Sequence, residues 1–476
     1  MSSVTPTSAA DVARAVIHAE TTGTTLRAVG GDWSLSDVAR TEGTTLDTSR
    51  LDAVKPLDPS TLRDPSLSPL LICVGAGIRM HVLNRLLAAQ GLAITNMGSH
   101  SGQSLAGNVQ TSSHGTGIHF GSVSDLVRSV RLVASGGRRF QIEPTDGITD
   151  PDTFHESDIT LVQDDDWFYS AVVSVGSMGI VTSVVLSVVP VFFLAETRVV
   201  RDWATVQEEL EGGRLYRDHR HCNVLINPYR RRRRYLCNVA TRNFTGTVPR
   251  WQQWIPRQNA VPTVVSVSGM ARGVVRAMNW RSKTVVPLVQ SGILRTMARK
   301  TSRHISHRIL DNGPLNLAHP VYAVEVSVPA SDTLAALNAV LRVAEQRAES
   351  GGYLTAPISV RWTGASQHYL SPQYGRESCI IELISLHDTV SGRDELRHYF
   401  EALLAFGGRQ HWGLDLYGFD GTDTRIRTDF PRFKVWKTRF DDLNQTGVFD
   451  SMFTQRCGLG VGPRMSGQTS RRQSGG

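Results

Sequence analysis

The sequence predicts an α+β protein with two domains, and three observations lead to this prediction. The chain has 476 residues, which is more than one hydrophobic core usually supports. In the first 190 residues, short apolar strands end at turns rich in glycine and serine, and helical segments alternate with them. After Pro190 the strands become longer and alternating, with helices between them, which is typical of an antiparallel sheet with helices on one face.

The elements expected in the first part are a helix over 11–19, a strand over 71–75, a helix over 78–90 and a strand over 127–134. The second helix has Leu83 and Leu87 at helical spacing, and Gly91 is placed to end it. Its junction with the preceding strand imitates a dinucleotide fingerprint, but Met80 stands where the third glycine is needed, so we exclude a nicotinamide site there. The acidic stretch 143–166 is expected to be a loop.

The second part is expected to hold an antiparallel sheet. Its predicted strands cover 222–226, 235–241, 322–328, 358–362 and 379–385, and its predicted helices cover 331–349 and 392–404. The tail 461–476 consists of small and polar residues and is expected to be disordered.

Three glycine-rich turns carry the functional signal. The longest, NMGSHSGQSLAGNVQTSSHGTG, runs from Asn96 to Gly117. A shorter one, GGDWS, follows a strand at Gly30, and a third precedes a strand at Gly179. Glycine lets a backbone pass close to a ligand, and successive N–H groups bind anions. Such turns therefore suit a large, polar, phosphate-bearing cofactor.

These three segments, in this order, resemble the vanillyl-alcohol-oxidase type of FAD-binding domain, and most closely its aldonolactone and alditol oxidase branch. The resemblance implies an FAD-binding domain over 1–190, a substrate domain over 191–410, and a C-terminal segment over 411–460 that returns to the flavin through HWG at His411. The residues it assigns to FAD are Gly30, Gly31, Asp32, Trp33, Ser34, Gly98, Ser99, Gln103, Ser104, Gly107, Asn108, Thr111, Ser112, His114, Gly115, Gly179, Ile180, Val181 and His411.

Within the long turn, individual residues carry further expectations. Gly31, Gly107 and Gly115 are expected to bring backbone close to FAD or to adopt positive φ. His114 is expected to hold the loop in shape as well as to border the cofactor, because polar groups in such a loop need partners.

Departures from the family's pattern are as informative as the matches. Many relatives carry FAD on a histidine where this chain has Trp33, so we expect noncovalent FAD, with the indole packed against the flavin's dimethylbenzene edge. The family's E-x-R motif is here Ser359 and Arg361, and its lysine after HWG is Leu414. Glu382, on the next predicted strand, is expected to supply a carboxylate to the same pocket.

The implied function is an FAD-dependent oxidoreductase that oxidises a CH–OH (or CH–NH) carbon by hydride transfer to flavin N5. Arg361 would stabilise the developing alkoxide or carbonyl, beside Ser359, and Glu382 or a pocket tyrosine would be the base. We expect O₂ as acceptor, giving H₂O₂, and a sugar-containing or secondary-metabolite alcohol as substrate in place of a simple alditol or aldonolactone. The alternative is a flavin dehydrogenase with another acceptor, in which Ser113 is the candidate residue that gates O₂.

Charge and cysteine content bound the remaining possibilities. The net charge is +8, and five consecutive arginines run from Arg230 to Arg234. These arginines are interpreted as a solvated turn or as a contact for an anionic substrate or partner. The alternative function from another class is a degenerate FAD fold that binds anions or nucleic acid. A nucleic-acid partner is nevertheless not expected. Five scattered cysteines indicate reduced thiols, no metal and a cytoplasmic protein. No apolar run approaches ~18 residues, so no membrane partner is expected.

Overall fold

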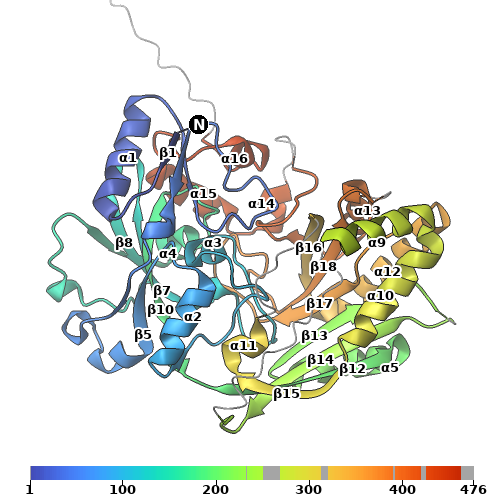
Figure 1. Cartoon of the computed structure of the whole chain (residues 1–476). Helices are drawn as coiled ribbons and strands as arrows, with labels where there is room; N and C mark the ends of the chain where they lie inside the picture. Colours follow the sequence, from blue (N-terminus) through green and yellow to red (C-terminus); the bar gives the residue numbers. More distant parts are fainter. Residues whose placement is uncertain are drawn as a thin grey trace, which may run out of the picture.

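The structure, a computed structural model, describes residues 2–231, 233–249, 268–311, 320–389, 392–419 and 425–461. A six-stranded sheet organises its first part and an eight-stranded sheet its second part, and the two sheets stand side by side (Figure 1). The C-terminal helices return to the first part, where α15 (Phe433–Leu443) packs against α4 (Asp165–Ala171). This confirms the α+β class with an antiparallel second sheet.

The first part contains two main sheets. A small parallel sheet has the order β1–β3–β2, with β1 (Ser2–Val4), β2 (Leu26–Val29) and β3 (Thr44–Asp47). The larger sheet has the order β4–β5–β10–β7–β8–β9, with β4 (Val54–Pro56), β5 (Leu71–Gly75), β7 (Val127–Val133), β8 (Arg139–Glu143), β9 (Thr160–Gln163) and β10 (Ile180–Ser187). The helices beside them are α1 (Ala9–Thr21), α2 (Met80–Ala89), α3 (Leu105–Gln110) and α4, and β6 (Leu92–Ala93) pairs with β11 (Val189–Pro190).

The second part is one antiparallel sheet in the order β15–β12–β14–β13–β17–β18–β16–β19. Its strands are β12 (Phe193–Asp202), β13 (His221–Ile226), β14 (Leu236–Thr245), β15 (Arg299–Ile305), β16 (Val321–Pro329), β17 (Ile358–Thr363), β18 (Ser378–Leu386) and β19 (Arg409–Gln410). Its helices are α5 (Trp203–Glu211), α6 (Arg214–Arg217), α9 (Ser268–Trp280), α10 (Ser282–Thr296), α11 (Ser306–Leu310), α12 (Thr333–Glu349) and α13 (Gly392–Leu404); α14 (Arg425–Asp429), α15 and α16 (Met452–Arg456) follow.

The register of the eight-stranded sheet separates two faces, because directly opposed residues of an antiparallel pair share a face. One row runs across four strands through Val224, Val360, Ile381 and Val326, and these side chains lie in a core with α5, α12 and α13. Alternate residues of the same strands form the opposite face, which carries charged and polar side chains next to apolar ones such as Ile380 and is here called the polar face. That polar face is where the predicted catalytic residues lie.

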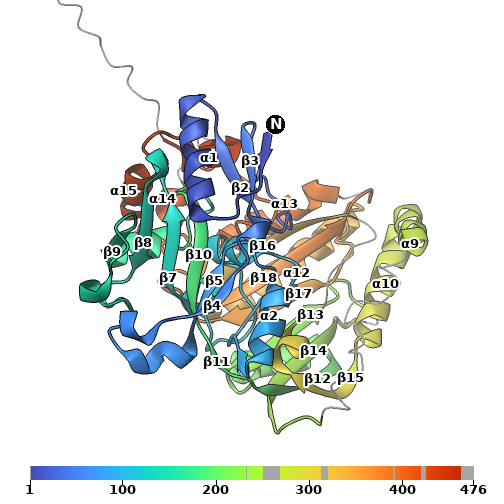
Figure 2. The same ribbon diagram turned by 60° about the vertical axis from the view of Figure 1, so that its left-hand side comes forward.

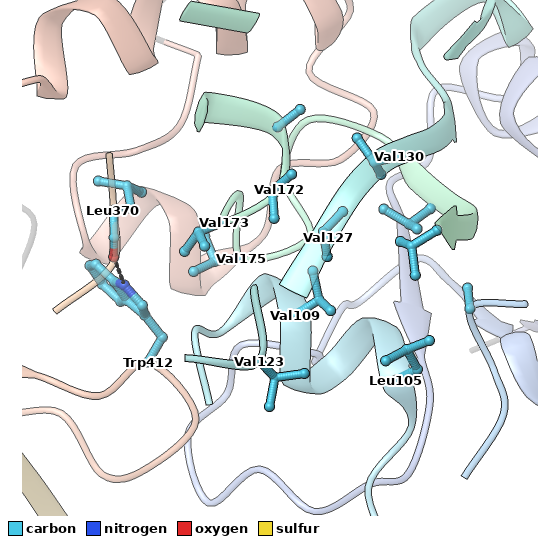
Figure 3. Close-up of a cluster of buried hydrophobic side chains, with 14 of the residues drawn as sticks. Leu105, Val109, Val123, Val127, Val130, Val172, Val173, Val175, Leu370 and Trp412 are labelled. Carbon is cyan, nitrogen blue, oxygen red and sulfur yellow. Dashed lines mark hydrogen bonds between the residues drawn. The ribbon is translucent and has the colours of Figure 1, made fainter. Parts of the chain in front are cut away.

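A second core fills the first part and includes the C-terminal segment. Figure 3 shows Leu105 and Val109 of α3 on the same side as Val127 and Val130 of β7. Trp412, which follows β19, joins this core and donates its indole N–H to the Leu370 carbonyl at 2.7 Å. The HWG segment is therefore anchored against the first part of the chain.

Most predicted elements are present, with boundaries shifted by a few residues, but two expectations are wrong. The stretch from Asn96 to Gly117 is not all loop, because α3 forms within it: the Ser104 hydroxyl accepts the Gly107 N–H at 3.3 Å and caps the helix. The stretch 143–166 contains β9, which pairs in parallel with β8. The tail expected to be disordered covers 461–476, and residues 462–476 of it lie outside the described part.

Candidate active site

Three charged side chains meet on the polar face of the eight-stranded sheet. Arg361 of β17 lies with its Nη2 atom 3.0 Å from Oε2 of Glu325 on β16, and it also contacts Oε2 of Glu382 on β18. Glu382 stands directly opposite both Ser359 and Glu325 in the register, so all of them share one face. The structure thus brings the predicted residues Ser359, Arg361 and Glu382 together and adds Glu325.

Two histidines join this cluster from outside the sheet. His114, from the long turn, lies with Nε2 2.8 Å from Oε1 of Glu325, and its Nδ1 lies 3.0 Å from the Gly115 carbonyl. One ring nitrogen therefore faces a carboxylate oxygen and the other a carbonyl oxygen. The His411 ring is 6.1 Å from that of His114, and its backbone N–H donates to the Glu325 carbonyl at 3.0 Å.

Burial and charge act in opposite directions in this cluster. Burial acts to raise the pKa of Glu325, but His114 and Arg361 outweigh it, and the net result is a pKa well below the ordinary value. Burial likewise acts to lower the pKa of Arg361, but Glu382 and Glu325 outweigh it and raise that pKa. Burial lowers the pKa of His411 to about 4. At neutral pH, Arg361 and Glu325 are charged and His411 is neutral.

Glu325 and Glu382 differ in how many of their carboxylate oxygens have a partner. Both oxygens of Glu325 are engaged, one by His114 and one by Arg361. Within the described part of the chain only one oxygen of Glu382 has a partner, and its side chain is 20% exposed against 6% for Glu325. The buried Nε of Arg361 also has no partner there. An acceptor oxygen and a donor N–H are therefore left for a substrate hydroxyl.

The turn at Gly30 has the features of an anion-binding nest. Asp32 adopts φ +53°, and no backbone hydrogen bond within the described residues begins at the N–H groups of residues 31–34. Successive unpaired N–H groups in such a turn favour phosphate oxygens. Nearby, a Cβ at Gly30 would overlap the Ser104 hydroxyl, so this turn and the long turn lie in contact.

Two buried polar atoms in the long turn also indicate that a ligand binds there. Asn96 Nδ2 and Gln103 Oε1 are buried with no hydrogen-bond partner, a state that costs free energy unless a ligand or water satisfies it. The side chains and backbone of these turns therefore fit a large polar cofactor with phosphate groups, and FAD is such a group.

Trp33 lies against the long turn. A Cβ at Gly102 would run into its indole, and its ring stacks on His100 at 6.0 Å. The indole therefore rests on backbone next to the nest. Its expected contact with the flavin's dimethylbenzene edge stays a prediction.

Several residues assigned to FAD have side chains that are used within the protein. Asn108 donates to the Ser104 carbonyl at 3.1 Å, the Thr111 hydroxyl donates to the Gly107 carbonyl at 2.7 Å, and the Ser112 hydroxyl donates to that of Ser371 at 2.9 Å. Ile180 and Val181 are buried core residues of β10. Gly98, Ser99 and Ser34 are half-buried and border the turns. Any contact from most of these residues to FAD would come from backbone.

Of the two alternatives expected for Gly31, Gly107 and Gly115, positive φ does not occur, and a close approach of their backbone to FAD stays a prediction. Positive φ occurs at Asp32, Ser112, Gly117 and Gly179, and not at Gly31, Gly107 or Gly115. A Cβ at Gly115 would overlap Asn96 and the Met97 carbonyl, so this glycine is required by packing against the protein itself. Gly107 is exposed, and a Cβ there would meet only the Ser104 hydroxyl, at 3.1 Å.

The end of the long turn is tied to the eight-stranded sheet. The Gly117 N–H donates to the Trp362 carbonyl at 2.7 Å, and the Gly364 N–H donates to the Phe120 carbonyl at 2.8 Å. Nδ1 of the buried His221 on β13 lies 2.6 Å from the Thr116 carbonyl. These contacts fix the position of His114 relative to Glu325.

Glu325 is the site residue that the sequence analysis missed. It lies in the strand VYAVEVSVP, where it is the only charged residue, and it is 5% exposed. A lone carboxylate within a buried strand needs a charged partner, because an unpaired buried charge is costly. That was the signal available in the sequence.

The arginine run forms a turn between β13 and β14. Arg231 and Arg234 pair through their backbones, and Arg233 adopts φ +65°. Arg230 lies 2.7 Å from Glu345, and Arg234 lies 2.7 Å from Asp202, in exposed ion pairs. Arg232 lies outside the described residues. The geometry agrees with the interpretation as a solvated turn.

The described residues contain neither a group of metal ligands nor a membrane-spanning helix. Among the described residues, no group of three or more His, Cys, Asp or Glu side chains is placed to hold a metal ion. The five cysteines are free thiols. No helix in the described part is long and apolar enough to cross a bilayer.

Comparison with known families matches nearly the whole chain. A model described as an FAD binding domain matches residues 2–143, and a model described as D-arabinono-1,4-lactone oxidase matches residues 184–457. The second match covers more than half of the chain and contains Arg361, Glu382, Glu325 and His411.

Individual relatives agree with these matches. The chain is 25% identical to an L-gulono-1,4-lactone dehydrogenase of Mycobacterium tuberculosis over 95% of each chain. It is 25% identical to an alditol oxidase of Streptomyces sp. over 80% of this chain and 79% of that protein. Among solved structures, a cholesterol oxidase from Brevibacterium sterolicum superposes with a TM-score of 0.75 at 13% identity, covering 96% of this chain and 93% of the other. That likeness shows the fold alone.

Proposed function

The chain belongs to the D-arabinono-1,4-lactone oxidase family, and from this premise we propose how its active site works. It is an FAD-dependent oxidoreductase that acts on CH–OH carbons. The observation that carries the proposal is Arg361 held between Glu325 and Glu382, where the long turn meets the sheet.

In the proposed mechanism Arg361 and Glu382 act on the substrate directly. Arg361 donates a hydrogen bond to the substrate oxygen and stabilises negative charge there as the C–O bond gains double-bond character. Glu382, through its free oxygen, accepts the hydroxyl proton. When bound, FAD supplies the acceptor for the hydride that leaves the same carbon with both C–H electrons. The CH–OH group thereby becomes a carbonyl.

Glu325 and His114 are positioning residues in this proposal. Glu325 holds Nη2 of Arg361 through one oxygen and His114 through the other, so it fixes the guanidinium relative to the cofactor turn. Ser359 stands opposite Glu382 and offers a hydroxyl to the same pocket. This arrangement replaces the family's E-x-R pair: the carboxylate comes from the neighbouring strand in place of the same one.

We propose that FAD is bound noncovalently by the turns at Gly30, Asn96 and Gly179. Trp33 at the usual attachment position supports this, because an indole cannot form that bond. The unpaired N–H groups of residues 31–34 would hold phosphate oxygens. The division into an FAD-binding domain over 1–190, a substrate domain over 191–410 and a returning segment over 411–460, and the cytoplasmic location, are part of the same proposal.

For the substrate we propose a sugar-containing or secondary-metabolite alcohol. Relatives named for lactones and alditols support a sugar-type substrate. Ser359 and Leu414 stand where the family has a carboxylate and a lysine, and both changes remove charged groups that a small polyol would use. A larger substrate that brings its own apolar surface fits this pocket better.

The electron acceptor divides the proposal into two candidates. O₂, with H₂O₂ as product, is the first, because several relatives are named oxidases. A dehydrogenase with another acceptor is the second, because a relative that aligns over 95% of the chain is named a dehydrogenase. Ser113, half-buried in the long turn, is the residue proposed to gate O₂.

One set of measurements tests the proposal. The purified protein should show a flavin spectrum, acid should release all FAD from the chain, and a panel of lactones, alditols and glycosides should be scored for flavin reduction without O₂. Peroxide on readmission of air identifies an oxidase; a reduced flavin that persists in air but passes electrons to a dye identifies a dehydrogenase. A protein without flavin that cannot be reconstituted with FAD would contradict the proposal.

A further inference from the structure

The charges of the chain are segregated along its sequence. Residues 219–310 contain eighteen Arg and Lys residues and no Asp or Glu, while the rest of the chain holds 33 basic residues against all 43 acidic ones. The net charge of +8 therefore conceals one strongly basic segment in an otherwise acidic protein. None of the catalytic chemistry proposed above needs this segment.

The described part of this segment gathers at one edge of the molecule. Figures 1 and 2 show α9 and α10 beside the eight-stranded sheet, on the side away from α1 and the six-stranded sheet. The turn between β13 and β14 lies against the same helices, because Asn227 donates to the Pro287 carbonyl and to the Ser291 hydroxyl at 3.0 and 2.9 Å. The start of this turn therefore packs against the middle of α10.

An exposed aromatic residue stands at the junction of the two helices. Trp280 ends α9 with 77% of its surface exposed, and Arg281 lies over its ring at 4.7 Å. Leu288, which shares a face of α10 with Arg281 because the two are seven residues apart, is 45% exposed, and Arg295 on the same face is also exposed. The opposite sides of both helices are buried through Met278 and Val286. The hairpin is thus fixed to the protein by one side and presents a basic and apolar other side.

We propose that this basic surface, formed by Trp280 with Arg281, Leu288 and Arg295, docks the enzyme on an anionic phospholipid membrane. An amphipathic helix with cations beside Trp and Leu lies in the plane of a bilayer interface, where the indole enters the headgroup layer and the cations face lipid phosphates. Such peripheral contact needs no spanning helix. It goes beyond the oxidoreductase function and does not depend on it.

A membrane fits these observations better than a nucleic acid. Proteins that bind single strands present several aromatic side chains along a positive groove, so that successive bases can stack. At the α9–α10 junction, as far as the described residues show, the exposed aromatic side chain is one indole, and an aliphatic side chain accompanies it. A lipid interface uses both the indole and the leucine, whereas a phosphate backbone uses neither.

The test uses the intact holoenzyme and sucrose-loaded vesicles. Vesicles of equal parts phosphatidylglycerol and phosphatidylcholine should sediment the protein at low salt; vesicles of phosphatidylcholine alone, or 1 M salt, where the screening length is about 3 Å, should not. The variant W280S/R281E should lower partitioning by roughly tenfold or more, because it removes the indole and reverses the charge of the cation beside it. The flavin content of this variant should equal that of wild type.

A matched control lies on α2. Arg85 and Leu86 are an exposed cation and an exposed apolar residue next to one another, with Leu86 40% exposed. R85E/L86S removes the same kinds of group from the first part of the chain and should leave sedimentation unchanged. Protein that stays in the supernatant with the anionic vesicles overturns the proposal, and so does an equal loss in both variants. A single-stranded oligonucleotide that strips wild-type protein from the vesicles at equimolar phosphate overturns it in favour of a nucleic-acid surface.

Discussion

The two faces of the eight-stranded sheet are made by the same strands, but one packs in the apolar core and the other carries the charged residues of the site. On β17, Ile358, Val360 and Trp362 enter the apolar core under α12 and α13. The alternate residues Ser359 and Arg361 point to the other face, where Glu382 and Glu325 meet them. Neighbouring residues in the sequence are thus separated by the thickness of one sheet.

The comparison teaches where stability and chemistry lie in this protein. The apolar face is covered by its own helices and gains free energy from buried surface. The polar face keeps charged groups out of water, which costs free energy unless each has a partner. Arg361 pairs with Glu325 and Glu382 of the same sheet, and His114 from a loop of the first part engages the other Glu325 oxygen. The polar face is therefore complete only when both parts are in place.

The largest effect is expected from a substitution that disrupts packing on the apolar face. Trp362 is fully buried, stacks on Tyr216 at 5.1 Å and donates to the Thr333 hydroxyl at 3.2 Å. Trp362→Ala should lower the free energy of unfolding by about 3–5 kcal/mol, because it leaves a cavity and an unpaired hydroxyl. Denaturant unfolding measures this change. Trp280→Ala is the matched control, since that indole is exposed; an equal loss in both variants would refute the assignment of the core.

The next largest effect is expected from a substitution on the polar face that leaves the apolar face unchanged. Glu325→Gln removes the charge that holds Arg361 and His114, and hydrogen bonds to charged groups contribute about 1.5–3 kcal/mol. Anaerobic flavin reduction should slow by roughly tenfold to a hundredfold, with FAD content close to wild type and a lower unfolding midpoint, because two buried groups lose their charged partner. Partial recovery in Glu325→Asp is expected if the carboxylate acts by positioning. A variant that reduces its flavin as fast as wild type would exclude Glu325 from the site.

The smallest effect concerns the junction between the faces and the long turn. Burial lowers the pKa of His221 to about 3, below the value of about 6.5 for an unfolded chain. The unfolded state therefore binds more protons between these values, and stability should fall as pH drops through this window, by up to about 1.4 kcal/mol per pH unit for this group. In His221→Asn the slope of unfolding free energy against pH should decrease by that amount. An unchanged slope would mean that His221 is not buried in its neutral form.

The sequence was sufficient for local structure and for the family. Periodicity located the strand over 71–75 and the helix over 392–404 with the bounds that the structure has. Glu382 was placed beside Arg361 from the alternation of two neighbouring strands, and the structure joins them. These predictions depend on residues close in sequence, or on one strand pairing.

What the sequence did not reveal depends on distant segments. Glu325 and His114 are 211 residues apart, and no local pattern indicates that a turn of the first part meets a strand of the second. The helix α3 was missed because its apolar positions, Leu105 and Val109, are surrounded by glycine and serine, and only packing against β7 stabilises so short a helix.

The most direct test compares two neighbours on β17 that point to opposite faces. In stopped-flow reduction without O₂, Arg361→Ala should keep its FAD but reduce it ~10²-fold or more slowly, as expected when one preorganised donor is lost. Val360→Ala should lose about 2 kcal/mol of stability and reduce its flavin at the wild-type rate. If Arg361→Ala reduces its flavin as fast as wild type, or if Val360→Ala is equally slow, the catalytic site is not on the polar face of this sheet.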